Sequence, residues 1–397
     1  MMTKSMVNND DDSILFSLDL VDDEDDSNGD NIPEPWDPSK IRISTKHFSL
    51  RDVVTQIMDE EIDLSPDFQR DYVWRKRQKT RLIESILLGI PLPAFYFNQS
   101  DDGSYQVIDG VQRLSTIAMF MNDEHILSHE DLEYLQGLNG LLFSKLDTAS
   151  SRRFRSTQIV VHVIEPQTPE EVKYDIFSRV NTSGSPLSAQ EIRHAMSKKR
   201  SRELLSELSE SSSFDKATDF NFWRKDSNGN NVRHSGRMTN RELVLRFLAF
   251  RNLNADEYRQ YKNLDAYLVE FTKRIDGHSK NNQSISEAEI NSLKFDFYQA
   301  MENANLIFDD TAFRRYPLNS KRKGPINRAV FESQAIALAD YKASDLEPKK
   351  KSINHAFREA FNDEIFVRSV SVGTGSPSAV EYRIKKMRDI LIGVLND

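Results

Sequence analysis

The chain has 397 residues, of which 38% are hydrophobic and 29% charged, and this length predicts two domains with additional tails. Cysteine is absent, which excludes disulfides, thiol catalysis and Cys-ligated metal centres and suits a reducing cytoplasm. No apolar run approaches the roughly 20 residues of a membrane span, and the acidic N-terminus lacks the apolar core of a secretion signal. We therefore expect a cytoplasmic protein without membrane contact.

The net charge of −9 comes from one end of the chain. Residues 1–30 contain ten acidic residues and one lysine, whereas the remaining residues contain 52 bases and 52 acids. This composition predicts an acidic disordered tail at 1–36, a first domain at 37–200 and a second at 201–397. The apolar run at 14–20 leaves three roles open for the tail: a solvated tail without a role, a docking peptide for a protein partner, or a nucleic-acid mimic over a basic groove.

The first domain is predicted to mix strands and helices. Capping residues, apolar spacing and β-branched alternation indicate the following elements. They are helices at 50–58 and 75–88, a hairpin of strands at 94–98 and 105–109, a helix at 111–121, a mixed and mostly helical stretch at 123–157, a strand at 159–164, and capped helices that start at 168 and 188.

The second domain has almost no strand pattern. Apolar residues recur there at helical spacing, which predicts a helical domain. The segments that carry this spacing are 243–248, 264–271, 293–307, 329–339 and 377–395.

The main candidate site is the junction between the strand that ends at Asp109 and the helix that follows Gly110. A helix start directs free backbone N–H groups and the positive end of the helix dipole outward, and both attract phosphate. Asp109, Gln112 and Arg113 add a carboxylate, an amide and a bidentate guanidinium at the same place. An ordinary capped helix is the competing interpretation.

Two other polar junctions are expected to converge on this turn. One is Gln69-Arg70, which follows a loop with a proline, and the other is the segment from Asn181 to the helix start at Ser188. Polar groups at such junctions usually belong to sites rather than to cores. We therefore predict that Gln69, Arg70, Asn181 and Ser188 line the same pocket.

The predicted chemistry of this pocket is phosphate binding. Arg70 and Arg113 with a helix N-terminus would form a triphosphate cradle, in which Asp109 holds Mg²⁺ through water or orients an attacking water. The alternative is purely structural. In that case the two arginines pair with carboxylates such as Asp67 and Glu191 and tie the domain together.

Other sites are poorly supported or uncertain. His125 and His129 have a spacing that suits metal ligands on a helix, but no third ligand is apparent, and no Walker-type Gly-Lys-Ser/Thr loop occurs. Three basic clusters with nearby aromatic residues suggest contact with DNA, and solvated helix faces are the alternative. The residues assigned to DNA are Arg75, Arg77, Lys198, Lys199, Arg200, Lys321, Arg322 and Lys323.

Three motifs follow one another in an order that resembles a known family. They are Phe68-Gln69-Arg70-x-Tyr72-x-Trp74, Ile108-Asp109-Gly110-Val111-Gln112-Arg113-Leu114, and Ile176-Phe177-x-x-Val180-Asn181-x-x-Gly184-x-x-Leu187-Ser188-x-x-Glu191-Ile192-Arg193. Together they resemble the N-terminal domain of the GmrSD-type modification-dependent restriction endonucleases, a bacterial family with a ParB/sulfiredoxin-like fold. The resemblance covers roughly residues 44–200, and residues 240–247 resemble the C-terminal part of shorter, stand-alone members.

The resemblance implies nucleotide handling in defence against phage. Family members bind and hydrolyse NTPs through an Asp-Gly-x-Gln-Arg motif, and several sense modified DNA. Here the motif corresponds to Asp109, Gly110, Gln112 and Arg113, and the family frequently has Gln at the position of Val111. No His-Asn-His type segment follows, so the resemblance implies a stand-alone form without the nuclease domain.

We therefore expect an α+β fold: a ParB/sulfiredoxin-like small mixed sheet with helices, followed by an all-helical domain. The expected function is Mg²⁺-dependent NTP hydrolysis in a restriction-type defence system that acts on DNA. Two alternatives remain. One is a DNA-binding or nicking module whose cradle holds a backbone phosphate, and the other is a non-enzymatic scaffold that recruits a partner nuclease.

Overall fold

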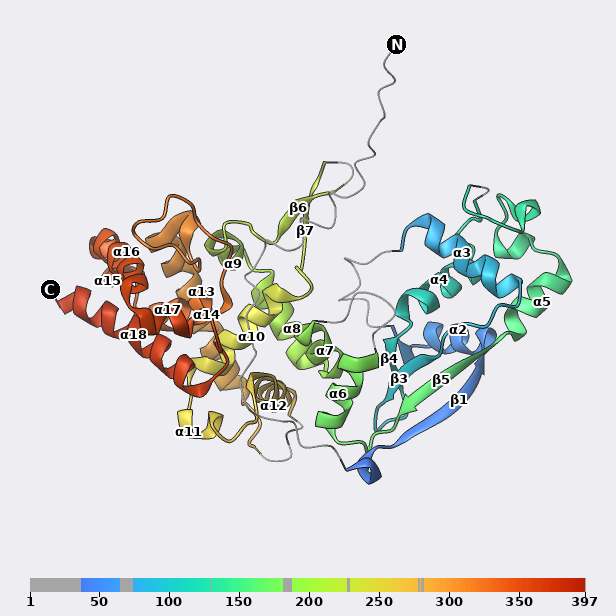
Figure 1. Cartoon of the computed structure of the whole chain (residues 1–397), viewed down its shortest axis with the longest axis horizontal. Coiled ribbons are helices and arrows are strands. Elements are labelled where there is room, and N and C mark those ends of the chain that lie inside the picture. The colour runs from blue at the N-terminus through green and yellow to red at the C-terminus, as the bar shows by residue number, and fades with distance from the viewer. Residues whose placement is uncertain are drawn as a thin grey trace, which may run out of the picture. The chain divides into compact units, whose positions relative to one another are not determined.

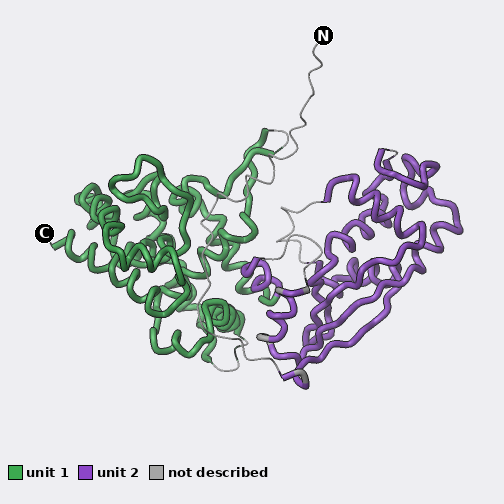
Figure 2. The backbone as a smooth tube through the Cα atoms, viewed as in Figure 1, with its two compact units in different colours: residues 1–32, 196–397 green, residues 33–195 purple. Residues whose placement is uncertain are grey.

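The computed structural model describes residues 37–64, 74–128, 130–180, 188–226, 229–277, 279 and 282–396. These residues form two compact units, which divide between Ala195 and Met196 (Figure 2). The predicted domain boundary was at residue 200. The predicted acidic tail at 1–36 lies outside the described residues, and so do Asp67, Gln69, Arg70, His129 and Asn181.

A five-stranded mixed sheet organises the first unit, in the order β1-β5-β3-β4-β2 (Figure 1). β1 pairs with β5 and β3 with β4 in antiparallel fashion, whereas β3–β5 and β2–β4 are parallel. The α+β prediction is confirmed, while the likeness to ParB and sulfiredoxin stays a prediction. The strands are β1 (Ile43–Ser49), β2 (Ile62–Asp63), β3 (Phe95–Gln99), β4 (Tyr105–Asp109) and β5 (Gln158–Ile164).

One face of this sheet carries the core of the unit. Alternate strand residues such as Phe95 and Phe97 are fully buried and form one apolar cluster with residues of four helices, because successive strand side chains point to opposite faces. Ser49 caps the first of these helices as predicted, since its Oγ accepts the Asp52 N–H at 3.2 Å. The helices are α2 (Leu50–Met58), α3 (Lys76–Leu87), α4 (Val111–Met121) and α5 (Thr148–Ser156).

Two parts of this unit differ from the prediction. Strand β1 was not predicted, because its sequence is mostly polar and its strand state depends on pairing with β5. The stretch at 123–157 is less helical than expected: it contains α5 and two short 3₁₀ turns. The buried Glu84 carboxylate explains this, because it accepts the backbone N–H groups of Glu133, Tyr134 and Leu135 at 2.7–3.0 Å and so holds the chain in an irregular path.

The second unit is helical, as predicted, around one large apolar cluster. It also contains a short antiparallel hairpin of β6 (Trp223–Lys225) and β7 (Asn231–Arg233), which the sequence did not predict. None of the helices in the described ranges has the length and hydropathy to cross a membrane. The main helices are α8 (Lys199–Ser209), α9 (Ser212–Ala217), α10 (Thr239–Arg251), α12 (Leu264–Asp276), α13 (Glu287–Phe308), α14 (Arg328–Leu338), α16 (Lys350–Glu359), α17 (Glu364–Ser369) and α18 (Pro377–Asn396).

Candidate functional site

The turn between β4 and α4 requires glycine at position 110. Gly110 has φ of 99° and ψ of 9°, the left-handed region that side chains with a Cβ rarely adopt. A Cβ built there would lie 2.2 Å from Cδ1 and 2.7 Å from Cε1 of Phe95. The backbone therefore packs directly against an aromatic ring of β3, and both conformation and space exclude a side chain.

The first turn of α4 lies immediately after this glycine. The Leu114 N–H donates to the Gly110 carbonyl at 2.9 Å, so the N–H groups that precede Leu114 come before the helical hydrogen-bond ladder. The side-chain oxygen Oε1 of Gln112 accepts the Trp74 N–H at 3.3 Å. Gln112 thereby ties the chain just before α3 to the start of α4.

The Arg113 guanidinium is held by the protein itself. It donates to Asp109 Oδ2 at 2.9 Å, to the Pro93 carbonyl at 2.5 Å and to the Ala94 carbonyl at 3.3 Å. It also lies over the Phe95 ring, 4.2 Å from the centroid. Only 11% of the Arg113 side chain is exposed, so the arginine clamps the turn to the start of β3.

The ionisation of Asp109 and Arg113 is governed by opposing effects. Burial raises the pKa of Asp109, and the positive charge of Arg113 and the Gly110 N–H partly offset this increase. Burial also lowers the pKa of Arg113, against the attraction of Asp109. Removal of either group therefore leaves its partner in a desolvated position without its ion pair.

Comparison with known families identifies this part of the chain. Residues 54–198 match the family model described as the GmrSD restriction endonuclease, N-terminal domain. This segment is therefore similar to the GmrSD N-terminal domain. The chain matches none of the curated proteins. The matched segment includes the sheet strands β2 to β5 and the whole Asp109–Arg113 turn.

The structure describes only part of the predicted pocket of this segment. Because Gln69, Arg70 and Asn181 lie outside the described residues, their convergence on the turn stays a prediction. Ser188 caps α7 (Ala189–Met196): its N–H donates to Glu191 Oε2 at 2.6 Å, and the Glu191 N–H donates to its Oγ at 3.1 Å.

Arg113 pairs with the Asp109 carboxylate, four residues earlier. The structural alternative had named Glu191 and Asp67, and Asp67 lies outside the described residues. Sequence reasoning did not anticipate Phe95 and the Pro93 carbonyl as partners of this arginine. They come from the start of β3, and no local signal links that segment to α4.

Metal ligands are few in the described part of the matched segment. No group of three or more histidine, aspartate or glutamate side chains is close enough to hold a metal ion there. His125 is buried and contacts Thr80, with 3.1 Å between its Nε2 and the Thr80 Oγ1, and burial lowers its pKa. Among the described residues Asp109 is the carboxylate at the turn, so a Mg²⁺ ion would need further ligands, for example from a bound phosphate.

The residues assigned to DNA differ in exposure and in their contacts. Arg75 and Arg77 are exposed at the start of α3, and Lys321 and Arg322 are exposed before α14. Arg200 instead has a structural position, since it donates to the carbonyls of Ile275 and Ile285 and pairs with Glu287. The remaining lysines are exposed or ion-paired: Lys198 is the N-cap of α8, Lys199 pairs with Glu203 at 3.6 Å, and Lys323 pairs with Asp219 and Asp310.

Proposed function

We propose that the chain is a nucleotide-dependent component of a restriction-type defence system that acts on DNA. The defence role is supported by the match of residues 54–198 to the N-terminal domain of a restriction endonuclease family. The nucleotide role is supported by the turn. Gly110 has no side chain there, and the helix that follows directs the positive end of its dipole toward the turn. The N–H groups at the start of α4, which precede the helical hydrogen-bond ladder, are the observation on which this proposal depends.

The proposed division of labour at the turn differs from a simple arginine cradle. The backbone N–H groups of the first turn of α4 bind phosphate, and the helix dipole adds to their attraction. Arg113 acts as a positioning residue, because its donors are engaged by Asp109 and by the carbonyls of Pro93 and Ala94. Its charge remains beside the phosphate site and favours the anion at short range.

Mg²⁺ would enter this site together with the nucleotide. The ion commonly keeps several waters and is bound by one or two carboxylates plus substrate phosphates. Asp109 would supply a carboxylate at the turn, and its bond to Arg113 favours contact with the ion through water. When bound, the ion would neutralise charge on the phosphates, and hydrolysis of the NTP is the proposed reaction.

Titration calorimetry of the full chain with ATP and GTP, with and without Mg²⁺, tests nucleotide binding. We expect Arg113→Ala to weaken binding about tenfold, equivalent to roughly 1.4 kcal/mol, because the turn loses its clamp. Arg155→Ala is the matched control: Arg155 lies 5.1 Å from the centroid of the Phe143 ring in the same unit, away from the turn. Its affinity should equal that of the wild type.

Turnover of NTP by the same proteins tests hydrolysis. Equal turnover by wild type and Arg113→Ala would refute the role of Arg113. Absence of nucleotide binding by the folded wild-type chain would refute the nucleotide function altogether. Melting curves of each variant distinguish a local effect from loss of the fold.

A DNA-binding module is the second candidate, favoured by the cations beside the turn. Arg75, Lys76 and Arg77 are consecutive and exposed, and the bond from Trp74 to Gln112 anchors them next to the start of α4. In this case the turn holds a backbone phosphate of DNA. Binding would then depend steeply on salt and would need no NTP.

A protein partner recruited through the acidic tail stays a further prediction. Deletion of residues 1–36 should abolish partner binding and leave nucleotide affinity unchanged if the chain is a scaffold. Unchanged partner binding after the deletion would exclude this role of the tail.

A further inference from the structure

Two loops of the helical unit come together beside the β6–β7 hairpin. We call residues 219–225 and 314–324 the hairpin surface. Lys323 Nζ contacts Asp219 Oδ2 at 2.9 Å, and Arg314 Nη2 donates to Asn221 Oδ1 at 3.4 Å, so the two loops are joined by their side chains. The hairpin itself projects from the helices of this unit (Figure 1).

The hairpin surface concentrates positive charge. Its two segments contain seven cations and one carboxylate, although the chain after residue 30 has equal numbers of bases and acids. Arg314 and Lys323 join the loops, whereas the side chains of Lys225, Arg315, Lys321 and Arg322 are exposed. Such a cluster attracts a polyanion, and the attraction weakens as salt is added.

An aromatic ring is exposed in the first segment of the hairpin surface, next to Asp219, which contacts Lys323. Phe220 is 54% exposed, whereas Phe222, two residues later, is buried and stacks on Phe214 with 5.5 Å between ring centroids. The adjacent Trp223 ring lies under the Arg233 guanidinium at 4.8 Å, and Asp215 holds that guanidinium through two hydrogen bonds. The exposed Phe220 ring therefore lies just before a hairpin whose Trp223 and Arg233 side chains are held in place.

Phe220 is held in this outward position by a backbone conformation that is unfavourable for phenylalanine. Asp219 and Phe220 both have φ of 53°, a left-handed conformation that is unusual for residues other than glycine and asparagine and unfavourable for a bulky ring. Two hydrogen bonds maintain it: Phe220 N–H to the Asp215 carbonyl at 2.8 Å and Trp223 N–H to the Phe220 carbonyl at 3.0 Å. Strain of this kind is concentrated at functional positions.

We infer that the hairpin surface binds DNA that presents an unpaired base. Phe220 would stack on the base, and the exposed cations of both loops would contact the flanking phosphates, the combination that single-stranded nucleic acids require. An acidic peptide would use the cations but would have no need for an exposed aromatic face. The choice of DNA over RNA rests on the proposed function, whereas stacking and phosphate contact do not.

Fluorescence anisotropy of the full chain with labelled oligonucleotides, without NTP, tests this inference. The probes are a single strand, its blunt duplex, the same duplex with one unpaired base, and an RNA single strand. We expect the single strand and the bulged duplex to bind about tenfold more tightly than the blunt duplex. Phe220→Ala should remove this preference, and Lys321→Glu/Arg322→Glu should weaken binding to all probes about tenfold and reduce the salt dependence.

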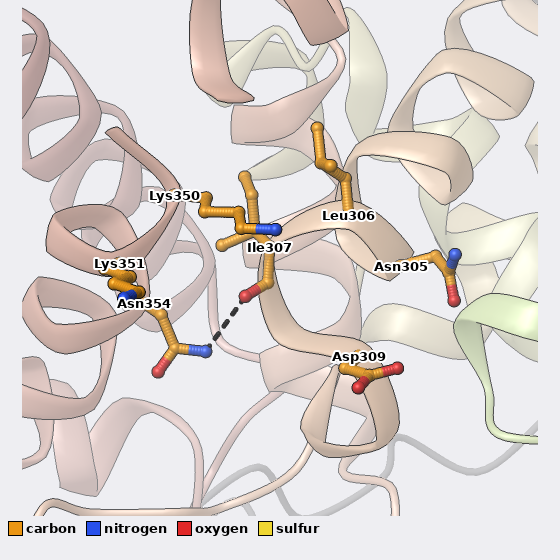
Figure 3. A pocket seen from close by; sticks show the side chains of 7 residues that line it. All are labelled: Asn305, Leu306, Ile307, Asp309, Lys350, Lys351 and Asn354. Atoms are coloured by element: carbon orange, nitrogen blue, oxygen red, sulfur yellow. Dashed lines mark hydrogen bonds between the residues drawn. The ribbon is translucent and has the colours of Figure 1, made fainter. Parts of the chain in front are cut away.

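Matched controls are available in the same unit. Phe295 on α13 is 65% exposed, so Phe295→Ala removes an exposed ring elsewhere. Lys350 and Lys351 are adjacent exposed lysines beside a hollow that also contains Asn305 and Asp309 (Figure 3). Lys350→Glu/Lys351→Glu therefore makes the same charge change outside the hairpin surface, and both controls should bind as the wild type does.

A substitution that relieves the strain separates binding from folding. Asparagine tolerates the left-handed region, so Phe220→Asn should melt at the same temperature as the wild type or higher and still lose the preference for unpaired bases. Affinities within twofold of the wild type for Phe220→Ala and for the Lys321/Arg322 variant would overturn the inference. Equal losses of affinity in the two control variants would also overturn it. RNA bound more tightly than DNA would overturn the choice of DNA.

This inference and the nucleotide proposal fail separately. Arg113→Ala should leave oligonucleotide binding unchanged, because the hairpin surface lies in the other unit. Phe220→Ala should likewise leave nucleotide affinity unchanged.

Discussion

Each unit of the protein contains an arginine paired with a carboxylate, and the two pairs differ in burial and in chain separation. Asp109 and Arg113 are four residues apart, and their side chains remain 15% and 11% exposed. Glu332 of α14 and Arg383 of α18 are 51 residues apart, and both side chains are fully buried. The first pair retains a connection to solvent and shapes a turn, whereas the second joins distant helices inside the core.

The buried pair belongs to a longer chain of charges. Arg246 of α10 lies 3.7 Å from Glu332 and 3.0 Å from Glu242. Arg383 also donates to the carbonyls of Ser369 at 2.9 Å and Thr374 at 2.7 Å. Desolvation of such charges is costly, and each remains tolerable only while its partners are present. An arginine–carboxylate pair is thus a structural joint when it is enclosed in the core and stays partly accessible when it lies at a turn.

The largest expected effect is the loss of Glu332. Glu332→Ala leaves Arg383 and Arg246 buried without this carboxylate, which should lower the free energy of unfolding of the helical unit by about 3–5 kcal/mol. Asp109→Ala should cost only about 1–2 kcal/mol, because Arg113 keeps two carbonyl partners and partial exposure. Urea denaturation followed by circular dichroism measures both.

A double variant provides the control for Glu332. Glu332→Leu with Arg383→Met removes both charges, and it should be more stable than Glu332→Ala if the uncompensated arginine is the cause. Equal costs for Glu332→Ala and Asp109→Ala would erase the distinction between the two pairs.

A smaller loss of stability is expected at Gly110, which lies between Asp109 and Arg113. Gly110→Ala forces a side chain into the left-handed region and into the Phe95 ring, which should destabilise the first unit by about 2–4 kcal/mol. Gly103 is a matched control in the β3–β4 hairpin: its φ is +90° and a Cβ there would meet no atom within 4 Å.

Gly103→Ala should cost about 1 kcal/mol, since only the backbone strain remains. Thermal melting of the two variants compares them directly. Equal decreases in melting temperature would mean that the contact with Phe95 contributes nothing. Gly110 would then be required only for its backbone conformation, as Gly103 is.

The smallest expected effect concerns pH and a neutral buried group. Burial, followed by the charges of Lys79 and Lys76, lowers the pKa of His125 below its usual 6.5. The unfolded chain therefore takes up a proton before the folded chain does, so stability is fully present above pH 6.5 and is lost as pH falls toward the lowered folded pKa. The loss should be about 1 kcal/mol or less between pH 7.5 and 5.5.

The variant His125→Asn isolates this contribution. Its melting temperature should change less between pH 7.5 and pH 5.5 than that of the wild type, because the titrating group is gone. An unchanged pH dependence would assign the loss to other groups and would leave His125 without a role in it.

Local elements were predictable because their signals are local. The capping residue Ser49, the capping box of Ser188 with Glu191 and the alternation of β3 and β4 all specify structure through neighbours within a few residues. Strand β1 and the β6–β7 hairpin lack such signals and form because partner strands supply their hydrogen bonds.

The strand, the glycine turn and the helix that carry Asp109 and Arg113 follow from local sequence, since backbone conformation and helical spacing depend on adjacent residues. The contacts of Arg113 with the start of β3, and the exposure of Phe220 beside the buried Phe222, arise only in the folded chain. Those contacts join segments far apart in the chain, and local sequence patterns do not predict their free energy.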